Sequence, residues 1–380
     1  MLPRPLSSLE HPRQAIRRFT PNWFTITMGT GVVALALNQV PLDIPGRAAL
    51  ARALWITNIA LFGAFAILYT ARWMLYRPEA RRIFEHPVMC MFFGAIPMAL
   101  ATLINGLLVF GASDGSGAAI DVAHVLWWLD VALSLGCAWL VPYLMFTRQA
   151  HDLPAMTAVW LLPLVAAEVA AASGGLLVAH LPPGPASLRI LWLSYVLWGI
   201  SVFPALGVLV ILFLRMTLHK LPRREMAATS WLSLGPLGTG ALALIVLGEQ
   251  APRVLAASPL AALGEVAHGA GVVAALALWG YGLWWLGLAV LVTRRYFREE
   301  VPFNMGWWAF TFPLGVYSLA TLALARTLHS AFFEVAGCAL VLLLIAFWVL
   351  VASRTLHGAF HGYLFVSPCL EGLPTSETQP

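Results

Sequence analysis

Two carboxylates stand inside apolar stretches of this sequence, where an ionisable side chain is costly. Asp130 follows a pair of tryptophans, and Glu168 lies five residues after Pro163. A charged side chain at the centre of a bilayer costs roughly 2.5–3.5 kcal/mol on insertion scales, so each carboxylate needs a partner or water. A titratable carboxyl at this depth is what a proton relay requires. Glu168 is therefore a candidate for proton coupling, and the alternative for both residues is a protonated or hydrogen-bonded structural carboxyl.

Other catalytic or metal-binding patterns are weak. The sequence has no phosphate-binding glycine loop, no GxSxG and no HExxH. His357 and His361 have the i, i+4 spacing of metal ligands, but no third ligand stands near them, so a packing pair at the membrane surface is favoured. The four cysteines are scattered without metal-like pairing. We expect no enzyme activity, no metal and no cofactor.

The elements that carry these residues are predicted to cross a membrane. The 380 residues are 60% hydrophobic and only 10% charged, and the mean hydropathy is +0.82. Apolar runs of about 20 residues recur throughout, which is typical of an all-α polytopic membrane protein. A cytoplasmic arm (1–20) and a cytoplasmic tail (361–380) flank one transmembrane domain (21–360). Ten spans are predicted, at 21–40, 53–76, 87–111, 121–147, 154–179, 188–216, 227–249, 266–293, 305–328 and 333–358.

The net charge of +5 reflects topology and does not predict nucleic-acid binding. Of the 22 Lys and Arg residues, 17 fall in the two ends of the chain and in the loops after even-numbered spans, and 5 fall in the other loops. Cytoplasmic segments carry an excess of Lys and Arg. We therefore expect both termini in the cytoplasm, in the bacterial inner (plasma) membrane. An odd number of spans would mix the two classes of loop.

Helix-breaking residues recur at near-regular spacing in the odd-numbered spans. Pro97, Pro163, Pro236 and Pro313 are separated by 66, 73 and 77 residues, about one helical hairpin each. In the first span, Gly29 and Gly31 take this place, and Gly29 lies 68 residues before Pro97. The spacing predicts five parallel-repeat hairpins whose kinked helices surround a central pore. The even spans, including the one with Asp130, are expected outside it.

The residues just before these anchors are predicted to form a constriction. They are Met28, Ile96, Leu162, Gly235 and Phe312. Apolar constrictions gate pores by dewetting, and Phe312 is the only aromatic residue of the five. Phe312 is therefore the predicted gate, and the alternative is that its ring fills space between helices.

Several motifs, in order along nearly the whole chain, resemble the tellurite-resistance/dicarboxylate transporter family. They are WFxxxMGTG (23–31), PM (97–98), LLP…GG (161–175), GP (235–236), FNxxWWxxTFP (303–313) and TLHxAF (355–360). The family includes slow-type anion channels and malate and sulfite transporters. The resemblance implies a ten-helix, five-hairpin protomer with its own pore, assembly as a homotrimer, anionic substrates, and an aromatic plug at the position of Phe312.

The predicted function is transport of small anions across the lipid bilayer. A C4-dicarboxylate (malate) carrier is the first interpretation, and a gated passive anion channel or a sulfite or tellurite exporter is the alternative. Glu168 favours a proton-coupled carrier. Arg326, at the outer end of the ninth span, is the nearest candidate for attracting anions, although the interpretation as an ordinary snorkelling arginine at the interface is favoured.

Overall fold

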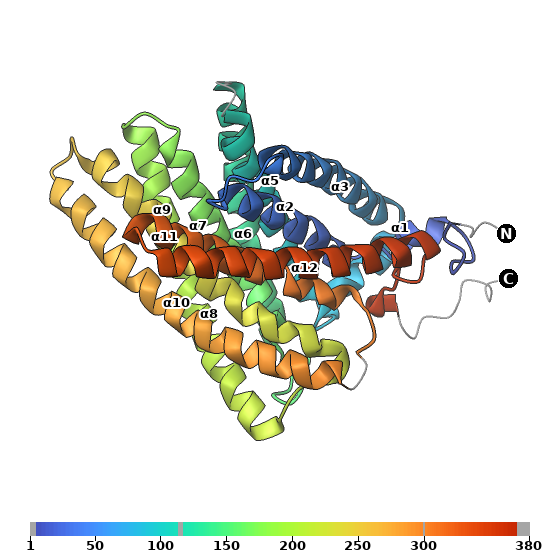
Figure 1. Cartoon of the computed structure of the whole chain (residues 1–380). Helices are drawn as coiled ribbons and strands as arrows, with labels where there is room; N and C mark the ends of the chain where they lie inside the picture. The colour runs from blue at the N-terminus through green and yellow to red at the C-terminus, as the bar shows by residue number, and fades with distance from the viewer. Residues whose placement is uncertain (1–4, 113–116, 299–300, 371–380) are drawn as a thin grey trace.

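The protein is a bundle of long helices, as the computed structural model shows (Figure 1). The structure describes residues 5–112, 117–298 and 301–370, and within these ranges it contains helices and no strand. Nine helical segments are long and apolar enough to cross a membrane. They are Arg47–Leu75, Met89–Gly111, Gly117–Thr147, Ala158–Ala179, Pro185–His219, Arg224–Leu255, Ala261–Phe297, Met305–Leu328 and Ala331–His361. The predicted all-α polytopic class is confirmed.

The first predicted span is shorter than the other nine. A turn of 3-10 helix at Pro21–Trp23 leads into α2 (Phe24–Gln39), which has 16 residues. A helix rises 1.5 Å per residue, so α2 alone is about 24 Å long, less than the roughly 30 Å of a hydrocarbon core. The count of ten spans therefore stays a prediction.

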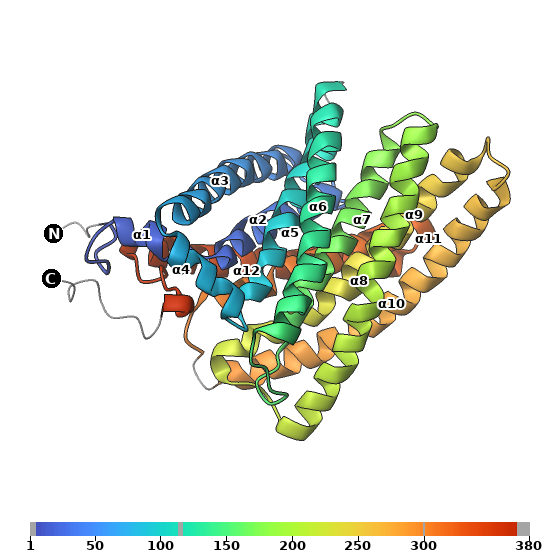
Figure 2. The ribbon, with the colours of Figure 1, turned by 180° about the vertical axis from the view of Figure 1, so that it is seen from behind.

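The helices form two layers. With α2 counted as the first span, the third, fifth, seventh and ninth spans have 67% to 94% of their most apolar stretch buried inside the protein. The corresponding share in the second, fourth, sixth, eighth and tenth spans is 17% to 33%. The inner layer consists of α2, α5 (Ala95–Gly106), α7 (Leu162–Ala179), α9 (Leu234–Leu255) and α11 (Phe312–Leu328). The outer layer consists of α3 (Arg47–Leu75), α6 (Gly117–Thr147), α8 (Pro185–His219), α10 (Ala261–Phe297) and α12 (Ala331–His361). Figure 1 shows α12 in front, and Figure 2 shows α6 and α8 in front.

The inner helices close into a ring, in which α2 packs on α5, α5 on α7, α7 on α9, α9 on α11 and α11 again on α2. Tryptophans of the outer helices tie this ring together, because each donates its indole N–H to the inner helix of the next hairpin. The bonds are Trp127 to Ala170 O, Trp198 to Gly240 O, Trp279 to Thr321 Oγ1 and Trp348 to Thr30 Oγ1, at 2.8–3.1 Å. The last bond joins the fifth hairpin to the first.

Each inner segment begins as 3-10 helix and continues as α-helix. The 3-10 parts are Pro21–Trp23, Met89–Gly94, Ala158–Leu161, Arg224–Ser233 and Met305–Phe310. The four predicted anchor prolines fall at the second or third α-helical position, where a missing N–H costs little. The carbonyl of Val159, which Pro163 cannot reach with an N–H, accepts from Leu162 N instead. The prolines thus favour the change of helix type.

Gly29 and Gly31 lie inside α2, which is one continuous α-helix. A Cβ at Gly29 would lie 2.3 Å from Thr311 Oγ1, and a Cβ at Gly31 would lie 2.2 Å from Thr102 Oγ1. Both distances are far below van der Waals contact. These two glycines therefore let α2 approach α11 and α5 closely.

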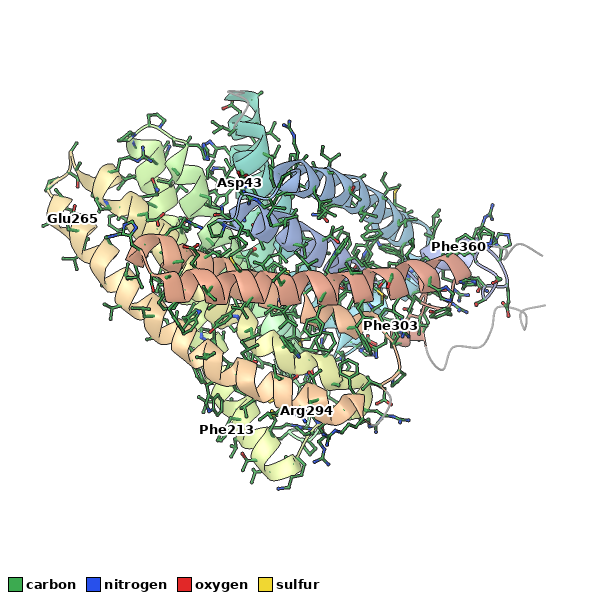
Figure 3. The ribbon with its side chains drawn as sticks, viewed as in Figure 1. Asp43, Phe213, Glu265, Arg294, Phe303 and Phe360 are labelled. Atoms are coloured by element: carbon green, nitrogen blue, oxygen red, sulfur yellow. The ribbon has the colours of Figure 1, made fainter. Side chains whose placement is uncertain are left out.

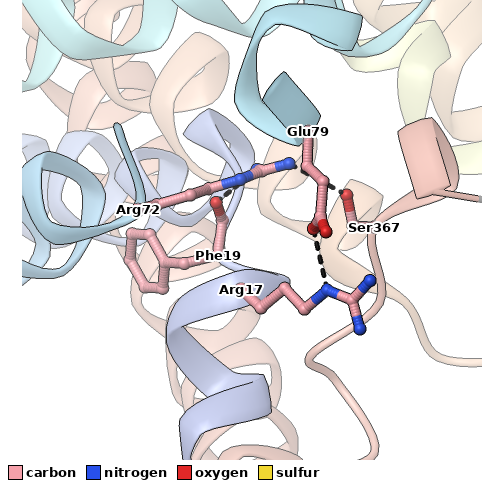
Figure 4. A network of polar contacts seen from close by, with 5 residues as sticks. All are labelled: Arg17, Phe19, Arg72, Glu79 and Ser367. Atoms are coloured by element: carbon pink, nitrogen blue, oxygen red, sulfur yellow. Dashed lines mark hydrogen bonds and ion pairs between the residues drawn. The ribbon is translucent and has the colours of Figure 1, made fainter. Parts of the chain in front are cut away.

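Both ends of the chain are fastened to one end of the bundle, which we call the terminal face (Figure 1). Arg72 on α3 is buried and donates to Phe19 O at 2.5 Å and to Ser367 Oγ at 3.3 Å (Figure 4). Beside it, Arg17 of α1 (Arg13–Arg17) forms an ion pair with Glu79 of α4 (Arg77–Arg81) at 2.8 Å. The terminal face is the predicted cytoplasmic side.

Candidate functional site: an axial cavity at the terminal face

A cavity of about 300 Å³ opens at the terminal face and is lined by all five inner segments. Its walls come mainly from their 3-10 parts, which face one another across the axis of the ring. Residues of this lining are Asn22, Thr25, Met28, Met89, Phe92, Val159, Leu162, Met226, Thr229, Leu232, Met305 and Ala309. Pro368, in the C-terminal segment that Arg72 holds, also lines it.

The cavity reaches two of the five residues predicted to form a constriction. Met28 and Leu162 line it and are 1% and 5% exposed. Gly235 lies at the start of α9, where a Cβ would meet only Val165, at 4.0 Å. Ile96 is half-buried at the start of α5. Leu162, Gly235 and Ile96 lie at the first or second position of their α-helices, and Met28 lies in the second turn of α2. Through Met28 and Leu162 the cavity extends up to the level at which the inner segments become α-helical.

Phe312 is the first residue of α11 and is 3% exposed. It does not line the axial cavity on the terminal side. Its near neighbour Phe310 stacks on Phe347 at 4.9 Å and also contacts Trp231 and Trp307. Within the described residues, Phe312 has no ring partner of this kind. The structure therefore places the Phe310 ring in an aromatic cluster and leaves the Phe312 ring outside that cluster.

The electrostatics of the cavity depend on backbone rather than on cationic side chains. Its lining includes Glu225 near the mouth but no Lys or Arg from the described part of the chain. The five inner helices run parallel and begin at this cavity. The N-terminal end of a helix carries a partial charge of about +0.5, and each inner segment starts with its 3-10 part, so five such ends converge around the mouth of the cavity. This arrangement favours an anion in an otherwise apolar space.

Sequence reasoning missed most of the lining residues. Met89 and Met305 stand eight residues before Pro97 and Pro313, and Met226 stands ten before Pro236. A search upstream of the anchor prolines for repeated residue types would have found these methionines. In the sequence, Asn304 was noted only as part of the motif at 303–313 and was given no role. In the structure, its side chain accepts a hydrogen bond from Gly306 N at 2.8 Å and donates one to Glu225 O at 3.0 Å.

Neither of the two intramembrane carboxyls is part of the lining of the axial cavity. Glu168 belongs to α7, and Asp130 belongs to the neighbouring α6. Asp130 is on α6, between Trp127 and Ser134, whose bonds to the carbonyls of Ala170 and Ala166 hold that face of α6 against α7. Glu168 of α7 stands at the same depth. Both carboxyls are fully buried. No oxygen of Asp130 has a hydrogen-bond partner within the described residues, whereas the Ser201 hydroxyl of α8 is the polar group nearest to the Glu168 carboxyl.

The remaining predicted residues lie at the two ends of the bundle. Arg326 lines a separate cavity of about 410 Å³ at the end opposite the terminal face, together with His329 and Glu334. The rings of His357 and His361 stand 4.3 Å apart at the end of α12. In the described part of the chain, no three His, Cys, Asp or Glu side chains are grouped closely enough to hold a metal ion.

A bundle of apolar helices around an axial cavity defines an integral membrane transporter or channel. The model of the voltage-dependent anion channel (SLAC1) family matches residues 18–356, and the chain therefore belongs to this family. Members of this family are membrane anion transporters and channels. The predicted resemblance to slow-type anion channels and their relatives is confirmed.

Individual relatives of this chain have names more specific than that of the family. The chain is 36% identical to the sulfite efflux pump SSU1 of Arthroderma benhamiae, over 92% of this chain and 93% of the relative. It is 28% identical to an uncharacterised transporter of Methanocaldococcus jannaschii, over 95% and 99%. It is 23% identical to the malic acid transport protein of Schizosaccharomyces pombe, over 89% and 78%.

Proposed function

We propose that this chain exports sulfite from the cell through the axis of its inner helix ring. The observation that carries anion passage is the axial cavity, which is apolar and on which the starts of five parallel helices converge. Support for sulfite comes from three relatives named as sulfite efflux pumps that are 36% identical to this chain, against 23% for the relative named for malic acid. We therefore rank sulfite above the C4-dicarboxylate that the sequence first favoured.

The proposed path runs along the axis and past the ring of Met28, Ile96, Leu162, Gly235 and Phe312. An ion entering the cavity leaves bulk water for an apolar lining and is stabilised by the helix N-termini. Phe312 closes the path in the resting state, because an aromatic ring blocks a narrow apolar conduit more completely than an aliphatic side chain does. Arg326, at the opposite end, attracts anions to that mouth.

We further propose a homotrimer in the bacterial inner membrane with both termini in the cytoplasm. Its orientation is supported by the excess of Lys and Arg at the terminal face. A cysteine introduced at Gly184 should react with an impermeant reagent from outside intact cells, whereas one at His219 should react only after permeabilisation. The opposite pattern would invert the topology. Ser113, a second outer position by sequence, lies outside the described residues.

The substrate and the mode of transport are tested by flux in proteoliposomes. Sulfite, malate, succinate, tellurite and chloride would be offered to the same preparation, with and without a pH gradient. We expect sulfite to move fastest. Uphill movement driven by the pH gradient indicates a carrier, and purely downhill current indicates a channel. A protein that moves malate but not sulfite would overturn the proposed substrate.

A further inference from the structure

A second cavity, of about 560 Å³, lies outside the helix ring, between the ends of α8 and α10 at the terminal face. We call it the α8–α10 groove. On the α8 side it is lined by Phe213, Met216, Thr217 and the loop Lys220, Leu221, Pro222; on the α10 side it is lined by Trp285, Leu288, Arg295 and Tyr296. Figure 3 labels Phe213 and Arg294, which lie at this same end of the bundle. The groove plays no part in the axial path.

The groove joins an apolar half to a cationic half. Phe213 is 50% exposed, and its ring lies 5.7 Å from that of Trp284, which is 45% exposed. Outer helices that expose large apolar side chains face hydrocarbon in a membrane protein. About two turns of helix separate Phe213 from Lys220, and Arg294 and Arg295 lie in the last turn of α10. Apolar residues followed by cations mark the boundary between acyl chains and headgroups.

Lys220 is held in its place by a strained backbone. It ends α8 with φ 63° and ψ −163°, a region that favours glycine. Arg215 supports this conformation: its side chain is buried and donates to Lys220 O at 2.6 Å and to Pro154 O at 2.5 Å. Tyr296 donates its hydroxyl to Pro222 O and fixes the other end of the loop. These bonds fix the backbone of the loop beside the groove, and the Lys220 ammonium group, which is exposed, donates to Thr217 O at 3.3 Å.

The floor of the groove is closed by Trp285, which is 2% exposed. Its Nε1 has no hydrogen-bond partner within the described residues, but this atom is itself inaccessible, so Trp285 serves the groove as an apolar wall. Tryptophans are enriched at the level of the headgroups, where one side of the ring is apolar.

From these observations we propose that the α8–α10 groove binds one anionic phospholipid of the leaflet that covers the terminal face. Its phosphate contacts Lys220 and Arg295, and an acyl chain lies along Phe213 and Leu288 over the Trp285 ring. The volume is within the range of small-molecule sites. Glu225, the nearest described carboxylate in sequence, pairs with Arg224. Glu299 and Glu300 lie outside the described residues.

The test compares lipids and variants of the full chain by native mass spectrometry and by melting temperature in nanodiscs. Phosphatidylglycerol should bind and stabilise wild type, whereas phosphatidylcholine and free inorganic phosphate should not. The double variant Lys220→Gln/Arg295→Gln should bind phosphatidylglycerol about 30-fold more weakly, since each cation near an anionic lipid contributes about a 5-fold factor. The control Arg81→Gln/Arg82→Gln removes two exposed charges elsewhere on the terminal face and should bind normally.

Equal binding by wild type and the Lys220/Arg295 variant would overturn the proposal. Protection by inorganic phosphate alone would overturn the lipid as ligand, and a change in oligomeric state with unchanged lipid binding would show instead that a second copy covers the groove.

Discussion

At the scale of single residues, Phe310 and Phe312 show why residue type alone does not define a gate. Both are buried aromatic residues in one motif, two positions apart. Phe310 stacks on Phe347, and its ring belongs to an aromatic cluster. Phe312 begins α11, beside a proline and at the level where the inner helices start. Their different surroundings make Phe310 a matched control for Phe312.

Replacing Phe312 with Ala should raise anion conductance, because the ring is proposed to close an apolar conduit. Replacing Phe310 with Ala should cost stability, roughly 3–5 kcal/mol, without raising conductance. Conductance in planar bilayers and thermal unfolding of the purified variants measure both quantities. A Phe312→Ala protein that is less stable and conducts no better than wild type would show that this ring only fills the core.

Glu168→Gln should change the pH dependence of sulfite flux, because it removes an ionisable group that is fully buried on α7, a helix of the inner ring. Asp130→Asn is the matched control, since Asp130 is equally buried but lies on an outer helix. Flux would be measured from about pH 5 to about pH 8, the range that buried carboxyls can reach. If Glu168→Gln follows the wild-type profile throughout, Glu168 has a structural role.

At the scale of helices, the inner ring depends on the close approach of neighbouring helices at glycine as much as on the anchor prolines. α2 has no proline, and it meets its neighbours through Gly29 and Gly31. In the other inner helices, a proline in the first α-helical turn accompanies the preceding 3-10 turn. The repeats therefore use two kinds of residue: prolines accompany the change from 3-10 to α-helix, and the glycines of α2 allow it to pack closely on its neighbours.

Gly31→Ala should destabilise the protein by about 1–3 kcal/mol, because its methyl group would overlap Thr102 and Asn58. Gly136→Ala, on the outer helix α6, should be neutral or slightly stabilising, since nothing lies within 4 Å of the added carbon. Melting temperatures in detergent distinguish the two. Equal stability of both variants would mean that α2 shifts away from α5 at little cost.

At the scale of the whole molecule, the ring is closed by contacts between the two ends of the chain. Trp348 of α12 bonds to Thr30 of α2, and Arg72 joins the N-terminal arm to the C-terminal segment. The segment held by Arg72 includes Pro368, which lines the axial cavity. Fastening the termini therefore also shapes the mouth of the proposed path.

Arg72→Met should release the C-terminal segment, because it removes the donors to Phe19 and Ser367 and leaves a buried carbonyl unpaired. We expect a loss of about 1–3 kcal/mol in stability and faster proteolysis after Gly362. Arg81→Met, an exposed arginine of the same face, should leave both unchanged. Resistance to proteolysis equal to that of wild type would show that packing of Phe365 on Trp23 suffices to hold the segment.

The sequence by itself determined the membrane class, the approximate limits of the spans and the alternation of inner and outer helices. These follow from one-dimensional patterns: a bilayer sets the length of an apolar run, and the anchor prolines recur at fixed intervals. The family also followed from ordered motifs, as the match over residues 18–356 shows.

Only the tertiary structure decided which side chains face the axis. That depends on how each helix is rotated in the ring, and a uniformly apolar helix has no polar face from which to predict its rotation. The methionines of the cavity, the position of Glu168 away from its lining and the α8–α10 groove all arise in this way. Residues such as Met28 and Trp348, far apart in sequence, acquire their roles because the ring closes.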